Sequence, residues 1–122
     1  MAKIFRLRTS STSALEKRRL ILLQRLRVPA NLVRASYVRQ FLTCGKTKCR
    51  CRRGQKHGPF HYLVQCLRAG KVRKFLLKTP QARQRAHAGI DAYAAFQEQL
   101  EELSQINTEL LRREASLNTS AA

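Results

Sequence analysis

The stretch CGKTKCRCRRGQKHGPF, residues 44–60, decides how the middle of this chain folds. Within fourteen residues it holds three cysteines and a histidine: Cys44, Cys49, Cys51 and His57. Three thiolates and an imidazole are a donor set that zinc accepts in a tetrahedron. Glycines in and beside the stretch permit the sharp turns of a small metal loop. A Cys-x-Cys pair forms no easy disulfide with itself, but both thiolates can reach one ion. We therefore predict a zinc loop with these four ligands.

Two alternatives to this metal site stay open. The spacing is not the common Cys-x2-Cys type, so the cysteines could instead be reduced structural thiols or a redox thiol cluster. The fourth ligand is also open, because His61 is an alternative to His57. If a strand begins at Phe60, His61 points to the face opposite Tyr62. Cys66 shares its face with Tyr62, and we expect it to be a small buried side chain rather than a ligand.

The motif Cys-Gly-Lys-x2-Cys-Arg-Cys, followed by His57-Gly58-Pro59-Phe60 and an aromatic-rich strand, resembles a family of small basic prokaryotic proteins of unknown function. The resemblance covers roughly residues 13–114. It implies that the loop is followed by a hairpin and a long C-terminal helix. It also implies a bacterial or archaeal origin and mobile-element or regulatory surroundings, and it brings no established activity.

Helices are expected on both sides of this loop. Ser13 and Glu16 fit a capping box, which begins a helix that runs to about residue 27 and is stopped by Pro29. Thr79-Pro80 is a strong start for a second helix, with a hydroxyl N-cap and proline at the first position. Its pattern continues to about residue 114, and Gly89 could bend it.

Three strands are expected between the helices, over residues 36–43, 60–68 and 72–78. Ala69-Gly70-Lys71 makes a tight turn between the last two strands, with Gly70 free to take positive φ. We therefore predict an α+β fold. It has an N-terminal helix, a small three-stranded antiparallel sheet with a Cys/His zinc-type loop, and a long C-terminal helix with coiled-coil character.

A heptad pattern marks the end of the second helix. Tyr93, Leu100 and Asn107 fall at one core position, and Phe96, Leu103 and Leu110 fall at the other. The alternative is that this helix packs on the chain's own sheet or first helix. We expect the turns from Leu100 to Leu110 to extend beyond so small a domain and to meet a second copy or another protein. The predicted contact residues are Phe96, Leu100, Leu103, Asn107 and Leu110.

These patterns divide the chain into four parts. We expect a flexible basic arm over residues 1–12 and a basic helix-sheet module over 13–95, which contains the loop 44–58. A protruding dimerisation or partner helix follows over 96–115, and a disordered tail over 116–122.

The charge is concentrated in one part of the 122-residue chain, whose formal net charge is +18. Residues 1–80 hold 21 Lys and Arg and one acid, Glu16, whereas residues 81–122 hold four cations and six acids. Such a density needs a polyanion, and nucleic acid is the first candidate. The predicted contacts lie on the loop and the following hairpin: Lys46, Lys48, Arg50, Arg52, Arg53, Lys56, Arg68, Lys71, Arg73 and Lys74.

The function predicted from the sequence is a zinc-stabilised nucleic-acid-binding protein. Duplex DNA is preferred, for a dimeric accessory or regulatory factor of a mobile element or similar system. One alternative is an RNA-binding component of an RNA-protein particle, in which aromatic residues stack on bases. The other is an adapter that recruits a partner enzyme through the C-terminal helix.

Other classes of protein are not expected. Residues 1–80 lack the several carboxylates of a two-metal nuclease, so we do not predict an enzyme. No apolar run approaches the ~18 residues of a membrane span, and the N-terminus lacks the apolar stretch of a secretion signal. We expect a cytoplasmic protein, associated with the nucleoid if it binds DNA.

Overall fold

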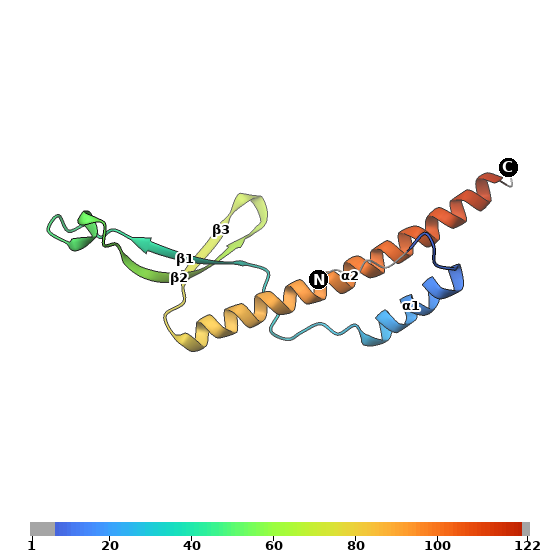
Figure 1. Ribbon diagram of the computed structural model, residues 1–122, viewed down its shortest axis with the longest axis horizontal. Coiled ribbons are helices and arrows are strands. Elements are labelled where there is room, and N and C mark those ends of the chain that lie inside the picture. Colours follow the sequence, from blue (N-terminus) through green and yellow to red (C-terminus); the bar gives the residue numbers. More distant parts are fainter. Residues whose placement is uncertain (1–6, 121–122) are drawn as a thin grey trace. The chain divides into compact units, whose positions relative to one another are not determined.

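The computed structural model describes the backbone of residues 7–120, and their side chains except those of Arg52 and residues 116–120. The predicted fold class is confirmed: an N-terminal helix, a three-stranded antiparallel sheet and a long C-terminal helix follow one another (Figure 1). No helix in this described part has the length and hydropathy of a membrane span. The elements are α1 (Thr12–Arg25), β1 (Ser36–Leu42), η1 (Arg50–Arg53), β2 (His57–Cys66), η2 (Arg68–Gly70), β3 (Val72–Leu76) and α2 (Pro80–Ser120).

The chain forms two compact units. The helix unit consists of Met1–Pro29 and Ala94–Ala122, and the sheet unit consists of Ala30–Tyr93. The first turns of the long helix α2 belong to the sheet unit, and the rest of α2 belongs to the helix unit. The sequence assigns α1 to the same module as the sheet, whereas the structure groups it with the second part of α2. The expected basic arm lies outside the described residues as far as residue 6, and residues 121–122 of the expected tail also lie outside them.

The sheet has the order β1-β2-β3, with both pairs antiparallel. The β1–β2 register runs from Ser36 opposite Val64 to Leu42 opposite His57, with an irregularity after Gln40. Gly58 has φ +134, and a Cβ there would lie 2.8 Å from the Gln40 carbonyl oxygen. This close approach lets β2 begin at His57, three residues before its predicted start, so that the pairing extends to the edge of the cysteine loop.

The connections after β2 follow the sequence closely. Gly70 has φ +71 in the turn before β3, as predicted, and Ala69 is also left-handed, with φ 60. β3 ends at Leu76, two residues early, and the Leu77 amide donates a hydrogen bond to the His61 carbonyl, 2.7 Å away. Thr79 caps α2 as predicted, since its hydroxyl accepts a hydrogen bond from the Ala82 amide at 3.1 Å.

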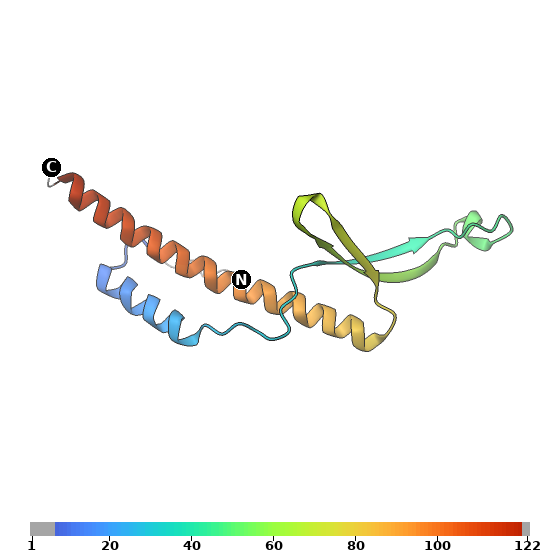
Figure 2. The same cartoon turned by 180° about the vertical axis from the view of Figure 1, so that it is seen from behind.

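The core of the sheet unit lies between the sheet and the first turns of α2 (Figure 2). Leu63, Leu77 and Ala86 are buried there, and partly buried apolar side chains from the segment before β1 and from α2 pack against them. Because this core is small, backbone contacts also contribute to the stability of the sheet unit. One of them is at Gly89, whose carbonyl accepts a hydrogen bond from the Val33 amide at 3.0 Å.

Gly89 allows the segment before β1 to lie directly on α2. A Cβ at this position would lie 2.5 Å from the Val33 Cγ2 and 2.6 Å from the Asn31 carbonyl oxygen. Both distances are shorter than real Cβ contacts allow, and one of the two neighbours is backbone. The glycine is therefore required for close packing.

Gly89→Ala is expected to destabilise the protein by about 1–3 kcal/mol, because overpacking outweighs the gain in helix propensity of about 1 kcal/mol. Ala88→Gly is the matched control on the exposed neighbouring position, and it should cost about 1 kcal/mol through propensity alone. Urea unfolding followed by circular dichroism measures both. A more stable Gly89→Ala variant would show that the segment before β1 does not touch the helix.

α1 begins two residues earlier than the capping-box prediction. The N-cap is Ser11, not Ser13, and its hydroxyl accepts a hydrogen bond from the Ala14 amide at 3.1 Å. Serine and threonine at residues 10–13 offer several possible caps, and the choice of Ser11 places Thr12 inside the helix. The helix ends at Arg25, two residues before its predicted end at about residue 27, and Leu26 is already extended.

The helix unit is held by a small apolar core. Leu15 and Leu22 of α1 are buried against Ile106 of α2, and Leu7, Leu103 and Leu110 pack around them. The expectation that the turns from Leu100 to Leu110 extend beyond the domain is therefore wrong for Leu103 and Leu110, which pack against α1, whereas Leu100 stays 43 % exposed. The asparagine of the heptad pattern also bonds within the chain, since the Asn107 Oδ1 accepts a hydrogen bond from the Arg19 guanidinium at 3.1 Å. The physical reason is that the leucines on one side of α1 pack against the apolar side of α2 that contains Ile106.

Polar contacts tie the start of α1 to the end of α2. Glu109 is buried and accepts hydrogen bonds from Arg112 at 2.7 Å and from Arg113 at 2.8 Å. Arg113 also donates to the carbonyl oxygens of Leu7 and Ser10 and to the Thr12 hydroxyl. These two arginines lower the pKa of Glu109 from 4.5 to about 2. α2 continues to Ser120, six residues beyond its predicted end.

Glu109 should make the free energy of unfolding depend on pH in the acid range. Between pH 4.5 and about 2 the unfolded carboxyl takes up a proton that the folded one does not. Stability from this group is therefore complete above pH 4.5 and is lost as the pH falls toward 2. Glu109→Gln should lower the unfolding midpoint at pH 7 and flatten the decline in this window. Glu101→Gln, an exposed change on the same helix, should do neither. Denaturant midpoints at several pH values measure this, and parallel curves for the wild type and Glu109→Gln would contradict it.

Candidate metal centre

The structure brings together the four predicted metal ligands. The donor atoms of Cys44, Cys49, Cys51 and His57 all lie within 4.8 Å of one another. The Cys44 and Cys51 sulfurs are 3.5 Å apart, and the Cys49 sulfur is 2.9 Å from the His57 Nε2. Zinc with Zn–S bonds of about 2.3 Å in a tetrahedron separates two sulfurs by about 3.8 Å. All four cysteines are free, so the donor set and its spacing fit a zinc site.

Strand pairing and a tight turn position these donors. Cys44 follows β1 and His57 begins β2, and the pairing of Leu42 with His57 holds the two ends of the loop together. Cys49 occupies the N-cap position of η1, and Cys51 lies within η1. The turn closes at Gly54, which has φ +100 and donates a hydrogen bond to the Cys51 carbonyl at 3.3 Å. Strand pairing therefore positions Cys44 and His57, and η1 places Cys49 and Cys51 between them.

The four donors differ in exposure. Cys51 is buried, with 2 % of its surface exposed, and its sulfur accepts a hydrogen bond from the Cys44 amide at 3.2 Å. Amide-to-sulfur hydrogen bonds of this kind orient a sulfur ligand in a metal site. Cys44 and Cys49 are half-buried and His57 is exposed. A hollow of about 390 Å³ beside them is lined by Leu42, Thr43, Cys44, Lys46, Cys49, His57 and Phe60. A chelator in solution can therefore reach one side of the site.

The other two candidate ligands lie outside this cluster. The His61 Nδ1 is 2.7 Å from the Tyr37 hydroxyl, within the sheet unit and away from the thiols. Burial, followed by the nearby cations Arg83 and Arg39, lowers the pKa of His61. The expectation that Cys66 is buried is wrong, because it is exposed at the end of β2, opposite Val72.

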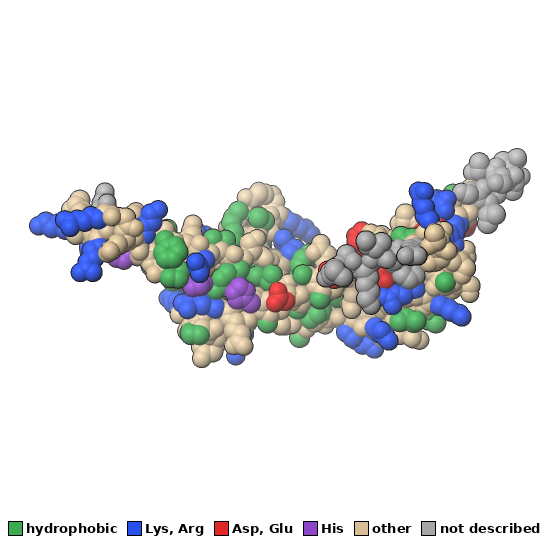
Figure 3. Space-filling model, viewed as in Figure 1, with side chains coloured by type: hydrophobic (Ala, Val, Ile, Leu, Met, Phe, Trp, Pro, Cys, Tyr) green, Lys and Arg blue, Asp and Glu red, His purple; other side chains and the backbone are tan. Residues whose placement is uncertain are grey.

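Cations surround the loop. Figure 3 shows Lys and Arg side chains around the end of the β1–β2 hairpin, and Lys46, Lys48, Arg50, Arg53 and Lys56 are all exposed. The side chain of Arg52, also a predicted contact, lies outside the described residues. On the second hairpin the predicted cations are exposed too: Arg68, Lys71, Arg73 and Lys74. Among them, Lys74 donates a hydrogen bond to the Gln40 amide oxygen at 3.0 Å and lies 4.4 Å from the Tyr62 ring centre. Residues 30–90 contain no Asp or Glu.

Exposed aromatic rings accompany some of these cations. The Phe75 side chain is exposed, with the Arg73 guanidinium 5.8 Å from its ring centre. The Phe41 ring is also exposed, with Arg39 at 5.7 Å, and sequence reasoning did not single it out. The signal that could have found it is the Arg-x-Phe spacing, which both strands share and which places the two side chains on one face. Tyr37, in contrast, packs in the sheet unit and stacks on His87, with ring centres 3.9 Å apart.

The fold and the site together define a small α+β protein with a Cys3His metal site at the end of a β-hairpin. The chain belongs to the family described as Domain of unknown function (DUF6788), whose model matches residues 12–86. That match spans α1, the sheet with its Cys/His loop, and the first turns of α2. Neither the curated proteins nor the solved structures gave a match to this chain.

Purified protein is expected to hold one zinc ion per chain. Cys51→Ser should lose the metal and lower the melting temperature, because metal binding contributes to folding of the loop. Cys66→Ser is the matched control, since that thiol lies outside the cluster. Elemental analysis and thermal melts with and without a chelator measure this. Metal-free wild-type protein whose melt ignores added zinc would contradict the site.

Proposed function

We propose that this protein is a zinc-stabilised nucleic-acid-binding module that prefers duplex DNA. The observation that carries the proposal is the exposed group of cations on the Cys/His loop, within residues 17–90, which contain no Asp or Glu. No carboxylate of the same unit before Asp91 can compensate these charges. Phosphate is the ligand that such a surface favours, and its binding is driven by release of counterions.

The metal gives this loop its role in binding. Arg50 stands between two of the metal ligands, and Lys46 and Lys48 stand between Cys44 and Cys49. Metal coordination would fix the backbone on both sides of these cations and reduce the entropy lost on binding. The hairpin that carries the loop is a two-stranded ribbon, an element that the major groove of B-DNA admits. These features support phosphate contacts by the loop at the edge of a groove.

The binding role that follows is accessory or regulatory. The basic stretch offers no pair of carboxylates to hold catalytic metal ions, and its thiols and His57 are committed to the Cys/His cluster. We therefore propose a factor that positions nucleic acid, for instance in a mobile element, and not one that cleaves it.

RNA is the second candidate ligand, and the exposed rings of Phe41 and Phe75 favour it. Each ring is accompanied by an arginine on the same strand face. Exposed aromatic and guanidinium groups stack on unpaired bases, each stack being worth about 1–3 kcal/mol. A protein that reads single strands would use these rings, whereas a protein that contacts duplex phosphates would not need them.

Binding to a labelled DNA duplex should fall steeply with salt. The double variant of Lys48 and Arg53, each changed to Gln, should reduce the slope of log K against log salt by about 2. The control changes Lys17 and Arg25 to Gln, which removes the same charge from α1 and should leave the slope nearly unchanged. Fluorescence anisotropy at several salt concentrations measures the slopes, with zinc content checked for each variant.

Competition between duplex DNA and single-stranded RNA at near-physiological salt decides between the two ligands. Preferred binding of the duplex supports the first proposal. Preferred binding of RNA, weakened by Phe75→Ala, would replace it with the second. Equal slopes for the loop variant and the α1 variant would reject the Cys/His loop as the binding surface.

A further inference from the structure

A second group of basic side chains lies in the sheet unit, on the side of the sheet that packs against α2. His61 of β2 is paired with Arg39 of β1, so the two side chains stand on the same face of the sheet. Tyr37, two residues before Arg39, shares this face and packs in the core against α2. Arg83 and His87 are four residues apart on α2 and so lie on one side of this helix. We call Arg39, His61, Arg83 and His87 the basic cluster.

Tyr37 links the two histidines of the basic cluster. Its hydroxyl is 2.7 Å from the His61 Nδ1, and its ring stacks on the His87 ring with centres 3.9 Å apart. The three rings are thus positioned by contacts with one another. The side chain of His61 is half-buried and that of His87 is exposed. A ligand in solution can therefore reach both imidazoles.

The two arginines of the cluster act on the same histidine from two elements. The Arg83 Nε donates a hydrogen bond to the Leu77 carbonyl at 3.2 Å, and the Leu77 amide donates to the His61 carbonyl at 2.7 Å. Arg39 is exposed on the neighbouring strand. Burial, followed by the positive charges of Arg83 and Arg39, lowers the pKa of His61. The segment after β3 contributes the apolar Leu77, so the charges around this imidazole are those of the cluster itself.

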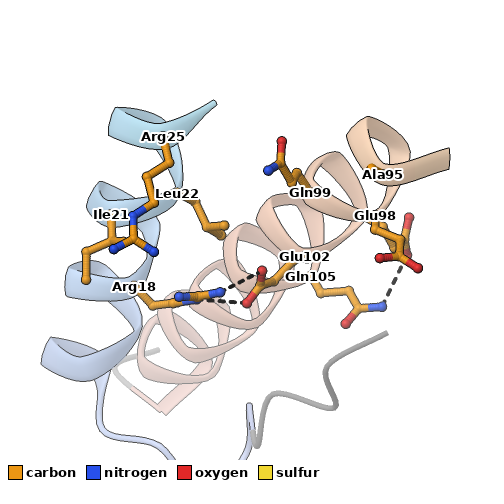
Figure 4. Close-up of a pocket in the computed structure, with 10 residues that line it drawn as sticks. Arg18, Ile21, Leu22, Arg25, Ala95, Glu98, Gln99, Glu102 and Gln105 are labelled. Carbon is orange, nitrogen blue, oxygen red and sulfur yellow. Dashed lines mark hydrogen bonds and ion pairs between the residues drawn. The ribbon is translucent and has the colours of Figure 1, made fainter. Parts of the chain in front are cut away.

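In the helix unit, an arginine between packed helices is matched by a carboxylate. Arg18 of α1 forms an ion pair with Glu102 of α2 at 2.8 Å (Figure 4). In contrast, residues 17–90 contain no Asp or Glu, and the first acid after them, Asp91, lies one turn beyond His87. One carboxylate is too few for two guanidinium groups and two imidazoles that can be protonated. The basic cluster therefore has an excess of positive charge, which a bound anion would neutralise.

We propose that the basic cluster binds a phosphate group. Guanidinium groups donate paired hydrogen bonds to phosphate oxygens, and a protonated imidazole donates one more. Because the Nδ1 of His61 is bonded to the Tyr37 hydroxyl, its Nε2 is the nitrogen that donates to the ligand. The site is separate from the Cys/His loop, since four residues of extended strand, about 13 Å, lie between His57 and His61. Where the proposed nucleic-acid binding holds, the phosphate is one of the backbone of that nucleic acid.

Phosphate binding at this site should be coupled to proton uptake. A phosphate beside His61 offsets the positive charges around it, and this raises the pKa of the histidine above its value in the free protein. The protonated cluster therefore binds more tightly than the neutral one. The affinity rises as the pH falls through the range in which histidine gains its charge.

Proton NMR of the full, zinc-loaded chain tests the site directly, with the three histidine rings as probes. At about pH 6.5, millimolar inorganic phosphate or a DNA duplex should shift the ring resonances of His61 and His87. A shift with both ligands supports a site that also takes free phosphate. A shift with the duplex alone supports a site for the nucleic-acid backbone. Rings of His61 and His87 that respond to neither ligand would overturn the proposal.

Matched variants test the two arginines. Arg83→Gln and Arg39→Gln should each weaken binding about tenfold, because each removes charge-assisted hydrogen bonds to the phosphate. Arg85→Gln is the control, since it removes the same charge from an exposed position about 200° around α2 from Arg83. Circular dichroism checks the fold of Arg83→Gln, which also loses the bond to Leu77, and the exposed Arg39 gives an independent test. Equal losses in Arg83→Gln and Arg85→Gln would reject the cluster.

Anisotropy with a labelled duplex separates this site from the Cys/His loop. Between about pH 7.5 and 6.0 the affinity should rise about fivefold, and His61→Gln should remove most of this rise. Zinc content is measured at both pH values, because metal binding is itself pH-dependent. A duplex that binds through the loop with the same pH dependence in His61→Gln would overturn the phosphate site and leave the proposed function standing. Inorganic phosphate bound at His61 by a protein that binds no duplex would support the site and reject the proposed function.

Discussion

The pairing of β1 with β2 is the constraint on which the sheet unit depends. It brings His57 opposite Leu42, and so places the last metal donor next to the end of the strand that leads to Cys44. The same pairing sets Tyr37 opposite Leu63 and thereby forms part of the core against α2. Gly58 is required for this register, because any side chain there would meet the Gln40 carbonyl. One strand pair therefore serves both the packing of the unit and the geometry of its site.

In the helix unit, α1 completes a core that α2 could not form alone. An isolated helix of the length of α2 would expose Ile106 and its neighbours, and α1, with only fourteen residues, would be marginal in water by itself. Their contact buries Leu15, Leu22 and Ile106 together. The polar bonds of Arg113 then fix the chain that leads into α1. Each helix is thus stabilised by the other more than by its own propensity.

Local signals in the sequence were sufficient for most of the fold. Thr79-Pro80, Gly70 and the aromatic and β-branched residues of the strands each act within a few positions, and the elements they predict are present. The four residues of the Cys/His cluster were also predicted from their spacing. The sequence could not show which apolar side of α2 packs against α1. The stripe of α2 that includes Leu103 and Leu110 fits a second chain as well as it fits α1, and only the three-dimensional packing decides. Ser11 was missed for a similar reason, since several neighbouring hydroxyls offer the same cap.

The position of the metal donors also affects how the β1–β2 hairpin forms. Fourteen residues separate Leu42 from His57, and closing so long a connection costs considerably more chain entropy than a two-residue turn. Donors at Cys44, Cys49, Cys51 and His57 divide that connection into three short segments of at most six residues. Once an ion is held, each closure becomes local, and strand pairing starts from ends that are already together. Metal binding at the Cys/His loop would in this way lower the chain-entropy cost of pairing the first two strands.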